Sequence, residues 1–259
     1  MALANQKGGV GKTTSTVNLA YALAQRGKSV LAIDLDPQAS LTIALGQDPR
    51  TLDQQHKTIN YGLLDNVPLK DIILEGTPAL IPASITLAKA EVSLVPRWNS
   101  VNVLKGKLRE IVAPGENVGR PTFDYLLIDC PPTLSLLTIN GLVAADTALI
   151  PVKTDYLSLM GLPLMLETIE EVQRSQNPTL TILGVLPTMF KSRNSHDREA
   201  LQEIRHSLEP HVHVFDPIAH STAFDKSAVE GKSTLEFLPN THGVENYYKL
   251  ADYILAHDQ

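Results

Sequence analysis

Eight residues near the amino terminus, Lys7-Gly8-Gly9-Val10-Gly11-Lys12-Thr13-Thr14, determine the architecture expected for this chain. A short apolar run suited to a buried strand precedes them at residues 2–4, and apolar residues at helical spacing follow them. A strand, a glycine-rich turn and a helix in this order place several backbone N–H groups and a helix N-terminus around one small volume. The sequence therefore predicts an anion site at this turn.

The residue types in the loop indicate which anion it binds. Gly8, Gly9 and Gly11 permit positive φ and a close approach of the backbone to phosphate oxygens. Lys12 can reach the β- and γ-phosphates of a nucleotide, and the Thr13 hydroxyl can bind magnesium. We therefore expect all eight residues to hold ATP with Mg²⁺. The alternative is a glycine turn that carries a lysine by chance.

The loop departs from the standard pattern G-x-x-x-x-G-K-[ST], which requires glycine at position 6, where this chain has Gln6. A further lysine, Lys7, stands directly before the double glycine. A lysine at this place is expected to point toward the phosphates of its own nucleotide or across to those of a partner. The alternative is a solvated surface charge.

The rest of the chain alternates between strand and helix patterns. Short apolar runs predict seven strands, at residues 2–4, 29–33, 79–81, 125–128, 148–152, 180–186 and 212–215. Helical spacing predicts a helix that ends near Gly27, helices over 156–174 and 196–208, and a last helix with Val244 and Leu255 on its apolar face. Residues 47–69 and 96–121 predict loops and short helices. Apolar strands joined by helices indicate an α/β fold, a mainly parallel sheet with helices on both faces.

Length and composition limit the class of protein. The 259 residues suit one α/β domain over 1–259, and 43% apolar with 19% charged residues describe a globular chain. A net charge of −6 argues against a whole-surface nucleic-acid binder. No apolar run approaches the roughly 18 residues of a membrane span, and no secretory leader is evident, so we expect a cytoplasmic protein. The single cysteine, Cys130, fits a reducing compartment.

Three aspartates stand at the ends of predicted strands. Asp36 ends an apolar strand and is the best candidate to orient or activate an attacking water, with a turn carboxylate before Pro37 as the alternative. Asp34 is expected to support the same segment structurally. Asp129 follows an apolar strand and is expected to hold magnesium through a water at the carboxyl edge of the sheet. The adjacent Cys130 is expected to be a buried, inert thiol.

At these residues the chain resembles the ParA/MinD family of deviant Walker A ATPases, and within it the ParA (Soj-like) branch. Asn5-Gln6-Lys7-Gly8-Gly9-Val10-Gly11-Lys12-Thr13-Thr14 resembles the family's phosphate loop, and Ala32-Ile33-Asp34-Leu35-Asp36-Pro37-Gln38 its first switch. Phe123-Asp124-Tyr125-Leu126-Leu127-Ile128-Asp129-Cys130-Pro131-Pro132 resembles its Walker B strand and second switch. Weaker likeness at Thr188-Met189-Phe190 and Gly231-Lys232 extends it over nearly the whole chain.

The resemblance implies a P-loop ATPase that forms an ATP sandwich dimer, in which Lys7 of each subunit reaches the other subunit's nucleotide. It implies slow hydrolysis until a ParB-like or other partner protein stimulates it, and a cargo such as a plasmid, a chromosome region or a carboxysome. The residues it implies are Lys7, Lys12 and Asp36 for catalysis, and Thr13, Asp36 and Asp129 for magnesium. For the nucleotide it implies Thr188 and Pro217 in addition to the eight loop residues.

The resemblance also implies salt-dependent binding to DNA without sequence preference, and so an association with the nucleoid. The DNA-binding candidates are Lys191, Arg193, Lys226 and Lys232. Two basic residues that the family carries after its counterpart of Pro217 are missing here, where the chain reads Ile218-Ala219-His220-Ser221. The charge pattern thus supports DNA binding less than the resemblance does.

Three alternatives remain open. A MinD-like positioning ATPase would dock on membranes through a basic amphipathic tail, but the last helix has a single lysine, Lys249, so its apolar face is expected to pack on the core and no membrane partner is expected. A metabolic ATP-dependent ligase of the same superfamily would use the same loop. The third alternative is an ATP-gated binding module whose hydrolysis only resets it.

Overall fold

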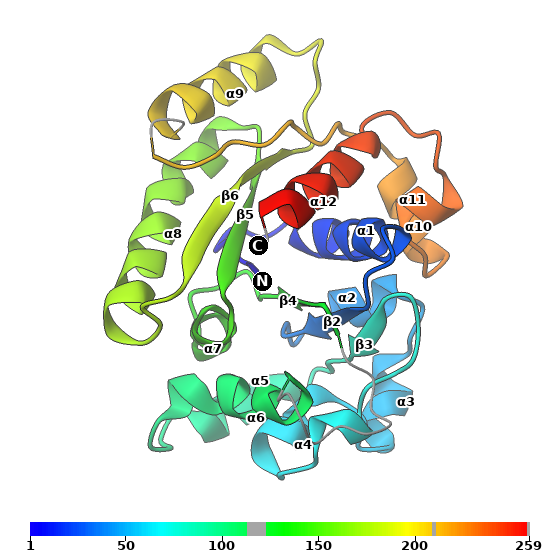
Figure 1. The fold of residues 1–259 in the computed structure, drawn as a ribbon, viewed down its shortest axis with the longest axis vertical. Helices are drawn as coiled ribbons and strands as arrows, with labels where there is room; N and C mark the ends of the chain where they lie inside the picture. The colour runs from blue at the N-terminus through cyan, green and yellow to red at the C-terminus, as the bar shows by residue number, and fades with distance from the viewer. Residues whose placement is uncertain (113–122, 209–210, 258–259) are drawn as a thin grey trace.

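The computed structural model describes residues 1–112, 123–208 and 211–257, and its centre is a sheet of six parallel strands (Figure 1). The strands are β1 (Ala2–Leu3), β2 (Val30–Asp34), β3 (Ala79–Ile81), β4 (Tyr125–Asp129), β5 (Thr147–Lys153) and β6 (Thr181–Thr188). Their order across the sheet is β3-β2-β4-β1-β5-β6, so the first strand lies in the middle. The predicted α/β class with a parallel sheet is confirmed.

Side chains alternate between the two faces of the sheet, and each face has its own core. Leu3 and Leu127 pack with helices α1 (Lys12–Gln25) and α12 (Glu245–His257) on one face. Ile128 and Ile150 point to the opposite face, which is covered by α4 (Ile59–Leu64), α5 (Leu87–Leu94), α6 (Val103–Val112), α7 (Leu136–Ala144) and α8 (Tyr156–Ser175). Both faces are therefore buried, as apolar strands in a parallel sheet require.

The remaining elements are mostly short. The helices are α2 (Ser40–Ala44), α3 (Pro49–Gln54), α4 (Ile59–Leu64), α5 (Leu87–Leu94), α6 (Val103–Val112), α7 (Leu136–Ala144), α8 (Tyr156–Ser175), α9 (Ser195–Leu208), α10 (Ala223–Val229) and α11 (Thr234–Phe237), with 3-10 turns at Leu69–Asp71 and Ser100–Asn102. Residues 47–69 hold short helices and turns, as predicted. The part of 96–121 beyond residue 112 lies outside the described residues.

The predicted helix boundaries agree with the structure. Gly27 has φ +79° and its N–H donates to Ala24 O at 2.9 Å, so this glycine ends α1. The helices α8 and α9 begin within one residue of their predicted starts. The last helix buries Tyr247 and Ile254 against the core, as its apolar face predicted. No helix within the described ranges is long and apolar enough to cross a membrane.

The seventh predicted strand, at residues 212–215, is wrong. This segment makes one isolated parallel bridge, between Val214 and Val185 of β6, with Phe215 N–H donating to Val185 O at 2.9 Å. The next rung of a regular ladder would need N–H groups at Pro187 and Pro217, which prolines lack. The chain instead bonds one residue later, from Ile218 N–H to Pro187 O at 2.8 Å. Two prolines therefore stop a strand that the apolar pattern predicted.

Two glycines bring the loop after α2 against the loop after α10. Gly231 has φ +67°, and a Cβ built on it would lie 2.5 Å from the Gly46 Cα, whereas a Cβ on Gly27, also at positive φ, meets nothing within 4 Å. We expect Gly231→Ala to lower the free energy of unfolding by about 2–4 kcal/mol through strain and backbone displacement. Gly27→Ala is the matched control and should cost about 1–2 kcal/mol through φ alone. Equal urea midpoints for the two variants would contradict the close approach.

Candidate nucleotide site

The glycine loop lies at the carboxyl edge of the sheet, between central strand β1 and helix α1. Because β4 and β5 flank β1 in parallel, the segments after all three strands meet at this edge. Gly9 and Gly11 have φ of +69° and +83°, as the sequence predicted, whereas Gly8 does not have positive φ. The Thr188 hydroxyl donates to Val10 O at 2.8 Å, and a Cβ on Gly11 would lie 3.7 Å from the Thr188 side chain. Thr188 therefore braces the loop from the end of β6.

Lys12 is almost fully buried in the first turn of α1, and its Nζ donates to the Lys7 carbonyl across the loop at 3.2 Å. Burial lowers the pKa of Lys12, while the negative charges of Asp129 and Asp36 oppose that shift. The ammonium group thus stands over the loop without a carboxylate in hydrogen-bonding contact among the described interactions. A phosphate group bound in the loop would meet this charge directly.

Two of the predicted magnesium residues lie in direct contact. Thr13 Oγ1 donates to Asp129 Oδ2 at 2.6 Å, and Thr16 Oγ1 lies 3.4 Å from the other carboxylate oxygen. Burial, and then the charge of Asp34, raise the pKa of Asp129 to about 8. A hydroxyl beside a buried carboxylate is the oxygen donor set that suits Mg²⁺, which takes few protein ligands together with phosphates and waters. These residues therefore fit the ion that the sequence predicted.

Asp34 anchors the segment that carries Asp36. Its buried carboxylate accepts hydrogen bonds from Thr42 Oγ1 at 2.7 Å, Thr42 N at 2.8 Å and Asp36 N at 3.1 Å. Burial raises the pKa of Asp34 to about 6, although these hydrogen bonds oppose the shift. Thr42 also accepts from Ala83 N at 2.9 Å, which ties α2 to the end of β3. The sequence predicted the supporting role of Asp34 but not its partner Thr42.

Asp36 lies beside the phosphate loop. Its Oδ1 accepts the Gln38 N–H at 2.9 Å, the turn interaction weighed as an alternative role for this residue. Its charge also acts on Lys12 and Asp129, which places the carboxylate within electrostatic reach of both. The turn holds Asp36 at the carboxyl edge, so the turn role and a role toward water are compatible.

Cys130 follows Asp129 and is buried, with its pKa raised to about 12 by burial and then by the charge of Asp129. The thiol therefore remains protonated and inert at neutral pH, as expected from the sequence.

Lys7 takes neither of the two positions considered from the sequence. Its Nζ donates to Asp155 Oδ1 at 3.0 Å and to Ser158 Oγ at 2.9 Å, at the start of α8 in its own subunit. Asp155 was not singled out from the sequence. A signal was present, because an aspartate before a long apolar helix is a typical N-cap, and its carboxylate does accept the Ser158 N–H at 2.8 Å.

Pro217 lines a cavity of about 360 Å³ with Phe190 and Asn246, whose side-chain amide donates to the Pro217 carbonyl at 2.9 Å. An aromatic ring and a side-chain amide of this kind suit a nucleotide base. Thr188 does not line this cavity, since its hydroxyl is used by the loop. The two residues predicted to contact the nucleotide outside the loop therefore have different surroundings.

The four predicted DNA-binding residues are exposed and fall into two groups. Lys191 and Arg193 follow β6 and line the same cavity as Pro217. Lys226 lies in α10, and Lys232 in the loop after it, where Lys232 Nζ pairs with Glu236 Oε1 at 3.6 Å. The four basic residues therefore do not form one cluster, and the charge of Glu236 offsets that of Lys232.

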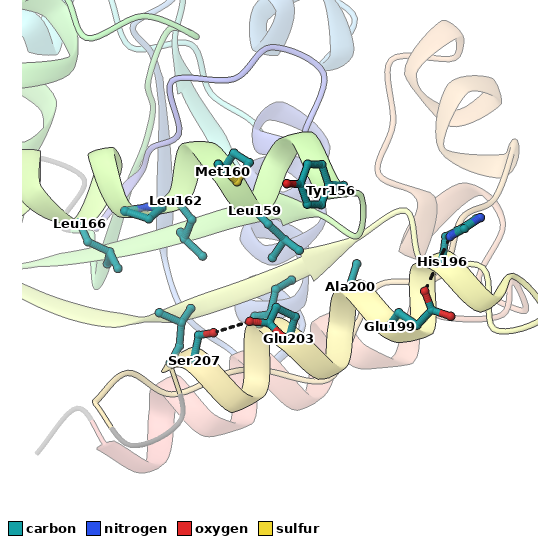
Figure 2. Close-up of a pocket in the computed structure, with 13 residues that line it drawn as sticks. Tyr156, Leu159, Met160, Leu162, Leu166, His196, Glu199, Ala200, Glu203 and Ser207 are labelled. Carbon is teal, nitrogen blue, oxygen red and sulfur yellow. Dashed lines mark hydrogen bonds and ion pairs between the residues drawn. The ribbon is translucent and has the colours of Figure 1, made fainter.

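A second, larger hollow lies between α8 and α9. Its volume is about 760 Å³, and Figure 2 shows Leu159, Leu162 and Leu166 of α8 pointing toward α9. Its charged rim comes from Glu199 and Glu203 of α9. No motif in the sequence pointed to this groove, because its two walls are 40 residues apart in the chain and meet only in the fold.

A strand, a glycine loop with a second lysine, a helix, and strand-end aspartates on neighbouring parallel strands define a P-loop protein of the deviant Walker A class. A family model described as an AAA domain matches residues 1–182. The sporulation initiation inhibitor protein Soj of Bacillus subtilis is 38% identical over 259 residues, covering 99% of this chain and 98% of Soj. The chromosome partitioning protein ParA of Caulobacter vibrioides is 35% identical, covering 100% of this chain and 94% of that protein. The chain belongs to the ParA/MinD family and is of the Soj/ParA type.

Solved structures agree in fold. A Mycobacterium smegmatis protein named as a cobyrinic acid a,c-diamide synthase, with bound ATP analogue and magnesium, is 35% identical with a TM-score of 0.83, covering 99% of this chain and 93% of that one. An aspartate-to-alanine variant of Cyanothece McdA in complex with ATP is 25% identical with a TM-score of 0.82, covering 100% and 96%.

The raised pKa of Asp129 predicts a pH dependence of nucleotide binding. A cation at this carboxylate requires its ionised form, so binding below about pH 8 must release a proton. We expect Mg·ATP affinity to rise by about fivefold from pH 7 to pH 8, and by about tenfold in all by pH 9, above which it levels off. Calorimetry in two buffers of different ionisation enthalpy measures the proton released, and Asp129→Asn should release none. Binding of the unaltered protein without proton release at pH 7 would contradict the prediction.

Proposed function

We propose that this chain is a ParA-type ATPase, a single domain over 1–259, that binds Mg·ATP, forms a nucleotide-sandwich dimer and binds DNA without sequence preference. Its cargo is a plasmid, a chromosome region or a protein body, its place is the cytoplasm at the nucleoid, and a partner protein stimulates its hydrolysis. The observation that supports this proposal most is the pair of lysines in one loop, Lys7 and Lys12, beside Asp36 at the carboxyl edge of the sheet.

In the proposed reaction the protein mainly positions charge. The loop N–H groups and Lys12 bind the β- and γ-phosphates, and Asp36 orients the attacking water. When bound, Mg²⁺ held by Thr13 and Asp129 would neutralise charge on the phosphates. Asp34, through Thr42, holds the segment that carries Asp36 in place. Turnover by these groups alone is expected to be slow, because Lys7 remains on α8 in a single subunit.

Exposed apolar side chains at the carboxyl edge support the proposed dimer. Ile85 follows β3, Leu134 follows β4, and Tyr156 and Leu157 follow β5, and these side chains are between 38% and 72% exposed. Apolar residues gathered at one edge of a soluble protein typically mark a contact surface. Since the glycine loop opens at the same edge, a second copy bound there would face it nucleotide to nucleotide.

A metabolic ligase remains a second candidate, because one structural neighbour carries the name of a diamide synthase. A ligase would consume ATP only with an organic acid present, whereas a partition-type ATPase would respond to DNA and a partner protein. ATP turnover measured with cobyrinic acid and ammonia, as the nitrogen source that an amide requires, against turnover with double-stranded DNA, separates the two. Turnover that requires the acid would overturn the partition proposal.

DNA binding has its own test. We expect Arg193→Ala to weaken retention of random-sequence DNA by the ATP-bound protein by about tenfold, and to reduce the slope of log affinity against log salt by about one. Lys57→Ala removes an exposed charge elsewhere and is the control. Filter binding over a salt series measures both quantities. Retention that is the same in both variants and independent of salt would contradict a phosphate contact at Arg193.

A further inference from the structure

Gln6, which breaks the standard phosphate-loop pattern, and Lys7, the additional lysine that follows it, both attach the loop to α8. Gln6 Nε2 donates to the Gly161 carbonyl at 2.9 Å, and Lys7 Nζ donates to Asp155 and Ser158. These partners are about 150 positions away in the chain, so the contact exists only in the folded subunit. A loop with the standard glycine at position 6 could not make the first of these bonds.

Asp155 has several partners at once. Its Oδ1 accepts from Lys7 Nζ and, as the N-cap of α8, from the Ser158 N–H, while its Oδ2 pairs with Lys153 Nζ at 3.0 Å. Partial burial opposes the shift, but the hydrogen bonds from Ser158, Lys153 and Lys7 lower the pKa of Asp155. The carboxylate is therefore ionised at neutral pH and holds two lysines of the same subunit.

Lys7 cannot contact α8 of its own subunit and the nucleotide of a partner subunit at the same time. Its ammonium group has three hydrogens, and two of them are committed to Asp155 and Ser158. To reach a nucleotide in a partner subunit it must leave both acceptors. When Lys7 leaves, Lys153 still pairs with Asp155, so the carboxylate keeps one cation. The release of Lys7 therefore costs less free energy than it would if Asp155 were left without a cation.

We propose that Asp155 and Ser158 are positioning residues that hold Lys7 on its own subunit, and that this contact, called Lys7 parking below, sets the ATP concentration at which two copies assemble. Lys153 lowers the cost of releasing Lys7, because it also pairs with Asp155. The inference rests on the proposed dimer and names how the dimer is held back. The first turn of α8 carries both the acceptors and the exposed Tyr156 and Leu157. Release of Lys7 and burial of this apolar turn would therefore take place at the same contact.

The test uses the full chain carrying Asp36→Ala, so that ATP persists, and follows the dimer fraction against ATP concentration by sedimentation velocity. Asp155→Asn keeps an acceptor for the helix cap but removes the charge. We expect it to lower the ATP concentration at half-assembly by about threefold to tenfold, because each dimer requires two releases. Lys153→Ala should raise that concentration by about twofold to fivefold, because Asp155 then holds Lys7 alone.

Asp155→Asn and Lys153→Ala should shift the ATP concentration at half-assembly in opposite directions. A general loss of structure would not separate the two variants in this way. The control is Asp252→Asn, which removes a carboxylate of α12 that pairs with Arg26. This variant should leave the midpoint unchanged. In the nucleotide-free protein, Asp155→Asn should also raise the acetylation rate of Lys7, measured by mass spectrometry against Lys57. If the parent dimerises but both α8 variants share its midpoint and Lys7 acetylates no faster, parking is overturned and the dimer stands. If the parent never dimerises, the dimer itself is overturned and parking with it.

Discussion

Replacing Asp36 with alanine is expected to lower the rate of ATP hydrolysis by about 100-fold or more, while nucleotide binding and assembly persist. A residue that orients and activates the attacking water contributes roughly 10²–10⁴ to the rate. The Asp36 side chain makes one described hydrogen bond, from Gln38 N–H, and Asp34 fixes the surrounding segment, so loss of this side chain should not unfold the site. Phosphate release measured under single-turnover conditions gives the rate.

The matched control for this variant is Asp48→Ala, which removes an exposed carboxylate that caps the short helix α3. It should lower stability slightly, through loss of the helix cap, and leave hydrolysis unchanged. Hydrolysis by Asp36→Ala within threefold of the unaltered protein would show that another group orients the water.

The second large effect is expected at Lys7. Lys7→Ala should reduce hydrolysis by about 100-fold or more, because a charge that stabilises the transferring phosphoryl group is worth about 10³–10⁵ in related reactions. It should also abolish assembly, yet leave ATP binding by the single subunit within a few-fold, since Lys7 is bonded to α8 there. Lys12→Ala should instead remove ATP binding itself, because Lys12 stands over the loop of its own subunit. Fluorescence titration with a labelled ATP analogue and sedimentation separate the two lysines.

Much of the fold could be predicted because the chain carries strong local signals. Short apolar runs identified all six strands of the sheet, and Gly27 marked the end of α1. The failure at residues 212–215 has a chemical cause, since Pro187 and Pro217 remove the N–H groups on which the next rung depends. An apolar pattern reports burial, whereas a strand also needs donors on both chains.

The site was less predictable where contacts join distant parts of the chain. The sequence identified the loop, Asp34 and Asp129, because each is next to a strand end. It could not indicate that Thr188 braces the loop or that Lys7 is held by Asp155, because these pairs are joined only by the strand order of the sheet. The family resemblance predicts the position of Lys7 in an ATP-bound dimer, whereas in the single subunit Lys7 contacts Asp155 and Ser158 of α8.

The central claim is that ATP joins two copies of this chain through Lys7. The most direct test is sedimentation equilibrium of the Asp36→Ala protein with and without Mg·ATP, alongside the same protein carrying Lys7→Ala as well. The claim predicts twice the 28.2 kDa of one chain with Mg·ATP, and 28.2 kDa without it and in the double variant. A mass of one chain under all conditions, or a dimer that persists without Lys7, would contradict it.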